Sequence, residues 1–141
     1  MPRYTIEEIK EAQELAAELH LYGCGHFCTL HPEHVRNICN GIGPEWMMEP
    51  ARVLLDKRHP TMKIPAMIHD VQYTYGTGTD DDFHAANHNL YLNGVIMAKQ
   101  QYAWYNPVRY LVINDARKLA NICDMFGKKA YREAIASRED N

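Results

Sequence analysis

Residues 79–101 form a long segment with the start and stop signals of a helix. The turn "GTGT" ends at Thr79, and the three aspartates that follow it suit the positive end of a helix dipole. We expect this helix to run to about Gln101. Asn106 followed by Pro107 is a second N-cap and first-turn pair, and the helix that it begins should end near Gly127.

Similar signals define shorter helices in the rest of the chain. Thr5 and Glu8 form a capping box for a first helix, which ends before Gly23. Apolar spacing predicts another helix over about 64–75 and a short last one near the C-terminus. The chain therefore reads as helices joined by turns.

These segments predict an all-α fold, a single small domain over residues 1–141. An N-terminal helix lies in 1–23, a Cys/His-rich and Gly-containing loop in 24–46, and the core helices in 62–135. The N-terminal half is expected to be loop-rich. Two long antiparallel helices in the C-terminal part carry the candidate site described below.

Charge and hydropathy exclude several classes of protein. The net charge is -3, so no strong basic field favours nucleic acid as a partner. The first 20 residues alternate charged and apolar positions, unlike a signal peptide, and no stretch approaches the ~20 apolar residues of a membrane span. We expect a cytoplasmic protein, with virion association also compatible, whose four cysteines are free thiols or metal ligands.

The stretch "IPAMIHDVQYTYG" contains the most informative side chains. His69 and Tyr73 lie four residues apart and share a helix face, whereas Asp70 points about 100° away. A histidine can act as a general base near neutral pH, and a carboxylate facing another way can ligate a cation. Upstream, "NGIGPEW" at 40–46 has the Gly-x-Gly pattern that lets backbone carbonyls turn towards a hard cation. If His69 and Asp70 stood alone, we would favour an ordinary polar helix face as their explanation.

The order of four segments resembles the phospholipase A2 superfamily, most of all its compact, cysteine-poor type in parvovirus capsids and in phage or prophage genes. The segments are "NGIGPEW", "IPAMIHDVQYTYG", "DFHAANHNLYLNG" and "ARKLANICDMFGKKAY". The resemblance implies calcium-dependent hydrolysis of a phospholipid ester. His69 would take a proton from water, and Tyr73 would hydrogen-bond to the group that orients His69. The implied calcium ligands are the Asp70 carboxylate and the backbone carbonyls of Gly41, Ile42 and Gly43.

The sequence departs from the family pattern at three places, one of which is the loop at 40–46, which has fewer glycines than in secreted members. The cysteine pairs that flank the His-Asp motif in secreted members are missing. The carboxylate expected to orient His69 falls on Asn87, which can accept a hydrogen bond but cannot stabilise an imidazolium charge. In a serine-protease triad the comparable Asp-to-Asn change costs about 10⁴ in turnover. Three options stay open: a slow enzyme, substitution by Asp81 or Asp82, or a fold that has lost its activity.

A second candidate metal site lies in the Cys/His-rich segment. Zinc is the metal that such ligands favour, and the candidate ligands are Cys24, Cys28, His34 and Cys39. Only two residues separate the Cys pair from the first histidine of the next pair, which excludes a single C2H2 finger but not a compact knuckle. The alternative is a set of buried thiols and surface imidazoles.

Aromatic residues gather around the turn at Asn106, namely Tyr102, Trp104, Tyr105 and Tyr110. They suit either a membrane-facing patch or core packing at a helix junction, and we favour the core.

Two functions from different classes follow. The first is a phospholipase A2-like hydrolase of a phage or prophage, with phospholipid as substrate, transient membrane contact and Ca²⁺ as the expected metal. The second is a non-catalytic helical module, a phage structural or interaction protein with a possible Zn²⁺-stapled loop. The oligomeric state is not predicted.

Overall fold

The computed structural model describes residues 4–41 and 59–139, and every regular element in those ranges is a helix. The helices are α1 (Ile6–Glu18), α2 (Gly25–Thr29), α3 (Pro32–Gly41), α5 (His59–Thr74), α6 (Asp80–Gln101), α7 (Pro107–Phe126) and α8 (Lys128–Glu139). The predicted all-α class is confirmed. In the described ranges, no helix is both long and apolar enough to cross a membrane.

The predicted helix starts are confirmed by their cap geometry. Thr5 and Glu8 form both hydrogen bonds of a capping box, at 3.1 and 3.3 Å. The Thr79 hydroxyl accepts from the Asp82 N–H at the start of α6, at 3.2 Å. The Asn106 side chain accepts from the Val108 N–H at 3.0 Å, with Pro107 in the first turn of α7. Each cap satisfies a backbone N–H that has no partner within its helix.

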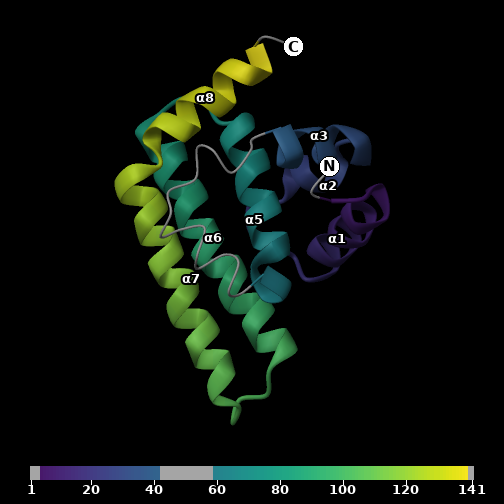
Figure 1. The fold of residues 1–141 in the computed structure, drawn as a ribbon, viewed down its shortest axis with the longest axis vertical. Coiled ribbons are helices and arrows are strands. Elements are labelled where there is room, and N and C mark those ends of the chain that lie inside the picture. Colours follow the sequence, from purple (N-terminus) through teal and green to yellow (C-terminus); the bar gives the residue numbers. More distant parts are fainter. Residues whose placement is uncertain (1–3, 42–58, 140–141) are drawn as a thin grey trace.

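Three long helices form the body of the molecule. Figure 1 shows α5, α6 and α7 side by side along the longest axis, with α6 in contact with both neighbours. Gly94 of α6 permits this close approach, because a Cβ there would lie 2.8 Å from the Cβ of Ala116 on α7 and 3.0 Å from the sulfur of Met62 on α5. The three helices therefore converge without space for a side chain at this position.

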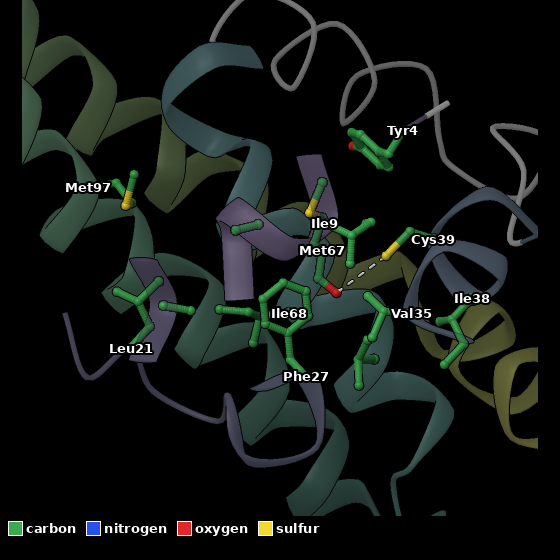
Figure 2. Packing of buried hydrophobic residues seen from close by; sticks show 13 residues of the cluster. Tyr4, Ile9, Leu21, Phe27, Val35, Ile38, Cys39, Met67, Ile68 and Met97 are labelled. Atoms are coloured by element: carbon green, nitrogen blue, oxygen red, sulfur yellow. Dashed lines mark hydrogen bonds between the residues drawn. The ribbon is translucent and has the colours of Figure 1, made fainter. Parts of the chain in front are cut away.

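The N-terminal helices pack against α5 through an apolar core. Its buried members include Ile9 of α1, Phe27 of α2, Val35 of α3 and Ile68 of α5, and each of these four is 0% exposed. Figure 2 shows these side chains converging, with the Cys39 thiol directed at the backbone carbonyl of Met67. This core joins α1–α3 to the three-helix body.

The loop predicted over 24–46 is wrong for residues 25–29 and 32–41, which are helical, and residues 42–46 lie outside the described residues. Pro32 and Glu33 suit the first turn of α3. Val35, Ile38 and Cys39 follow at spacings of three and four and are buried. The abundance of Cys and His obscured an ordinary amphipathic helix. A smaller correction concerns α5, which begins at His59, before the predicted start near residue 64.

Candidate functional site

The centre of the site is a buried imidazole on α5. His69 is 4% exposed and Tyr73, one helical turn later, is 1% exposed. Their rings lie 4.1 Å apart between centroids, which confirms that they share one face of the helix. That face is turned towards α6, where both side chains meet Asn87.

Asn87 is hydrogen-bonded to both residues. Its side-chain oxygen lies 2.8 Å from Nε2 of His69 and accepts from the Tyr73 hydroxyl at 2.6 Å. Asn87 is itself 2% exposed, so these contacts are shielded from water. The structure thus brings together the three residues that the resemblance placed in one catalytic group.

A fourth residue, missed by the sequence analysis, completes this network. The Asn87 amide donates from Nδ2 to Oδ1 of Asp124 on α7, at 3.1 Å. The same carboxylate oxygen pairs with Nδ1 of His84 on α6. We call the four linked residues His69, Tyr73, Asn87 and Asp124 the polar network.

One signal for Asp124 was present in the sequence. It lies in the last turn of α7, where a negative charge opposes the helix dipole. A carboxylate in such a place implies a partner elsewhere in the fold. Its partner Asn87 is 37 residues away, so local spacing could not identify it.

The hydrogen-bond pattern assigns the orientation of the amide and the imidazole tautomer. An ionised carboxylate only accepts, so the amide nitrogen of Asn87 must face Asp124 and its oxygen must face His69 and Tyr73. An amide oxygen cannot donate, so Nε2 of His69 carries the proton. In the neutral ring Nδ1 therefore keeps its lone pair. Among the described residues, none hydrogen-bonds to this nitrogen.

Burial dominates the protonation of this centre. It lowers the pKa of His69 to about 4, although the hydrogen bond with Asn87 acts in the opposite direction. Burial also raises the pKa of Tyr73, so its hydroxyl stays a donor. For Asp124 burial acts to raise the pKa, but the hydrogen bonds from His84 and Asn87 outweigh it and the pKa is lowered. At neutral pH the network therefore holds a neutral imidazole and an ionised carboxylate.

The surroundings of Tyr73 hold its hydroxyl in place. Its ring packs edge-on against Tyr131 of α8, at 5.2 Å between centroids, and against Phe83 of α6 at 5.8 Å. Gly127 lies beside the hydroxyl, and a Cβ there would approach the Tyr73 oxygen to 3.0 Å. The turn between α7 and α8 thus needs a residue without a side chain at this point.

The structure describes only some of the predicted calcium ligands. Asp70 is on α5 and is 8% exposed. Its charge contributes to raising the pKa of Tyr73 and that of Cys123, although burial is the larger cause for both. Gly41 is the last residue of α3, and Ile42 and Gly43 lie outside the described residues. The proposed calcium ligand set therefore stays a prediction.

The structure does not place either alternative aspartate beside His69. Asp82 accepts from the backbone N–H of Thr77 at 3.0 Å and also from its hydroxyl, which closes the turn before α6. Asp81 is exposed on the first turn of α6. The carboxylate behind Asn87 is Asp124 instead.

The four candidate zinc ligands have different environments. Cys24 and Cys28 are neighbours, and burial together with Cys24 raises the pKa of Cys28 to about 12. Cys39 is buried in the core, and His34 packs against the edge of Tyr75. Within residues 4–41 and 59–139, no three His, Cys, Asp or Glu side chains are placed to share a metal ion. Zinc binding also stays a prediction.

Comparison of the chain with protein-family models, with curated proteins and with solved structures gives no match.

Proposed function

We propose that the protein is a calcium-dependent hydrolase of phospholipid esters, similar to phospholipase A2, in which His69 activates a water molecule. The observation that carries this proposal is the shared contact of His69 and Tyr73 with the Asn87 oxygen. This contact presents an imidazole in a single tautomer, with the lone pair of Nδ1 directed away from the network. The resemblance to phage and prophage proteins suggests that this chain serves a phage.

His69 is the general base in this mechanism. Its Nδ1 accepts a proton from water as the oxygen of that water attacks the ester carbonyl. The ring then becomes a cation whose Nε2–H stays bonded to Asn87. A base with a pKa near 4 is weak, so the developing imidazolium needs stabilisation from nearby groups.

Asp124 supplies the negative charge that Asn87 lacks. It acts through the amide, because Nδ2 of Asn87 donates to Asp124 while the oxygen of Asn87 accepts from His69. Linked hydrogen bonds polarise one another, so the carboxylate increases the negative charge on the amide oxygen. Asp124 is a positioning residue in this scheme, because it does not touch the imidazole.

The residues that would hold calcium include Asp70 and the backbone carbonyls of Gly41, Ile42 and Gly43. A carboxylate next to the base in the chain fits the oxygen ligands that calcium prefers. When bound, calcium would polarise the ester carbonyl and stabilise negative charge on its oxygen.

The direct test is fatty-acid release from mixed phospholipid vesicles, with calcium and then with a chelator. We expect release that depends on calcium and is abolished in His69→Ala. The matched control is His88→Ala, since His88 is an exposed imidazole on α6 outside the polar network. Release that survives His69→Ala, or no release by the unmodified chain, would contradict the proposal.

The burial of His69 favours a second candidate, a non-catalytic helical module with a phage structural or interaction role. At 4% exposure, a histidine, a tyrosine and an asparagine that satisfy one another can hold α5 against α6 without any chemistry. This candidate predicts that His69→Ala lowers stability and that no vesicle hydrolysis occurs in either protein.

A further inference from the structure

The connection between α6 and α7 exposes a group of large apolar side chains. Trp104 is 72% exposed, Tyr105 73%, Tyr110 53% and Leu111 52%. We call residues 102–111 the aromatic tip. These exposures overturn the expectation that the aromatic residues near Asn106 form core packing.

The position of the tip explains its exposure. The Thr61 hydroxyl donates to Gln101 at 2.8 Å, so the first turns of α5 lie beside the last turn of α6. Figure 1 shows the α6–α7 connection projecting beyond this point, past the end of α5 and away from α1–α3. In the described part of the chain, no third helix covers the side chains of the tip.

The tip is ordered by its own hydrogen bonds. The Tyr110 hydroxyl donates to the backbone carbonyl of Trp104 at 2.6 Å, and the Asn106 N–H donates to that of Ala103 at 2.9 Å. The rings of Trp104 and Tyr105 meet edge to face at 5.7 Å between centroids. Exposed rings on a turn held in this way lose little conformational freedom on binding.

The stretch of sequence that forms the tip and the adjoining helix turns differs in charge sign from the whole chain. Residues 83–114 contain no aspartate or glutamate, whereas the chain as a whole has a net charge of -3. This stretch carries Lys99, which is exposed, and Arg109, whose guanidinium lies 6.0 Å from the centroid of the Tyr110 ring. Two cations and no acid make this end of the hairpin complementary to an anionic surface.

We propose that the aromatic tip docks on lipid bilayers that contain anionic phospholipid. Trp and Tyr favour the headgroup level of a bilayer, where the ring is partly apolar and its N–H or O–H stays hydrated. Lys and Arg beside them attract the anionic headgroups. A projecting end suits insertion into a deformable bilayer interface better than binding in a protein groove.

Docking and the proposed chemistry occupy different parts of α6. Asn87 lies roughly 20 Å along the helix from Gln101 at the end of α6. Binding by the tip therefore goes beyond the proposed hydrolysis and does not require it. His69→Ala should leave vesicle binding unchanged, so a failure of hydrolysis and a failure of docking are distinguishable.

The test uses the two tryptophans of the chain. In Trp46→Phe, Trp104 is the sole tryptophan and its emission reports its environment. We expect a blue shift with phosphatidylcholine vesicles that contain phosphatidylglycerol, and little change with phosphatidylcholine alone. Vesicle co-sedimentation of the otherwise unmodified chain is the second measurement, should Trp46→Phe fail to fold.

Variants then locate the binding surface. The double variant Trp104→Ala, Tyr105→Ala should lower vesicle partitioning about tenfold or more, and Lys99→Gln about fivefold. The matched control is Met125→Ala, because Met125 is 73% exposed like Tyr105 but lies at the opposite end of α7. It should bind as the unmodified chain does.

Four outcomes would overturn the proposal. They are absence of binding to anionic vesicles, equal binding to neutral vesicles, undiminished binding by the double variant, and an equal loss in Met125→Ala. A concentration-dependent mass in solution that the double variant abolishes would instead identify the tip as an interface between copies of this chain.

Discussion

The two ends of the α6–α7 hairpin differ in how far they bury their aromatic and polar side chains. Near its open end, where α5, α7 and α8 surround α6, Tyr73 and Asn87 are at most 2% exposed and are hydrogen-bonded to each other. At the closed end α6 and α7 are the two helices that meet among the described residues, and Trp104 and Tyr105 are more than 70% exposed. The number of neighbouring helices, and not the residue type, therefore decides whether such a side chain is part of the core.

The strongest test of this comparison removes one aromatic ring from each end. Phe83→Ala should lower the free energy of unfolding by about 4 kcal/mol, because Phe83 is 1% exposed and packs on Tyr73 and Tyr131. Trp104→Ala should change it by less than about 0.5 kcal/mol. Urea denaturation measures both values, and similar losses in the two variants would refute the contrast.

A smaller loss is expected when the central amide is removed. Asn87→Leu should cost about 3 kcal/mol of stability, because the Tyr73 hydroxyl and the imidazole of His69 lose their common acceptor in a buried place. The control is Asn114→Leu, an exposed amide on α7. Thermal or urea unfolding of both variants checks the prediction, and a loss in Asn87→Leu no larger than in the control would contradict it.

The buried imidazole also predicts a pH dependence. The pKa of His69 is about 4 in the folded chain, against 6.5 for an ordinary histidine, so the unfolded chain binds a proton first as the pH falls. This stability is fully present above pH 6.5 and is lost as the pH falls towards 4, a total of about 3 kcal/mol.

The measurement is the free energy of unfolding at pH 7 and at pH 4, for the unmodified chain and for His69→Gln. The loss between the two pH values should be about 3 kcal/mol smaller in the variant. An equal loss in both proteins would mean that the imidazole is not held neutral by burial.

Removal of the charge on Asp124 should have a smaller effect on stability. Asp124→Asn should cost about 1 kcal/mol or less, because the Asp124 side chain is 43% exposed. If hydrolysis is detected, turnover should fall about tenfold or more, since the charge behind Asn87 is lost. The control is Asp81→Asn, which removes an exposed carboxylate outside the polar network.

An exchange of the residues at positions 87 and 124 tests directly whether the carboxylate acts on the imidazole of His69. In Asn87→Asp with Asp124→Asn, the carboxylate moves next to His69 and the amide moves behind it. We expect this pair of changes to raise the pKa of His69, followed by NMR of its ring nitrogens, whether or not hydrolysis occurs. An unchanged pKa would show that the hydrogen bond to position 87 does not control the imidazole.

Part of the candidate site could be predicted from the sequence. His69 and Tyr73 share a helix face by their spacing alone, and the resemblance placed Asn87 beside them. Asp124 was missed because its contact with Asn87 spans 37 residues and depends on how α7 packs against α6. The helices α2 and α3 were not predicted for a different reason, since α2 has only five residues and the apolar positions Val35 and Ile38 of α3 lie among Cys and His residues that also suit a metal-binding loop.

Local sequence signals were enough to predict the helices of the C-terminal half. Their starts are marked by Thr79, Asn106 and Pro107. A capping hydrogen bond joins residues two or three positions apart, so it can be predicted from the local sequence. Which side chains those helices bury depends on how the helices pack against one another. This packing placed Asp124 behind Asn87 and left Trp104 uncovered, because burial depends on contacts between helices that are distant in the chain.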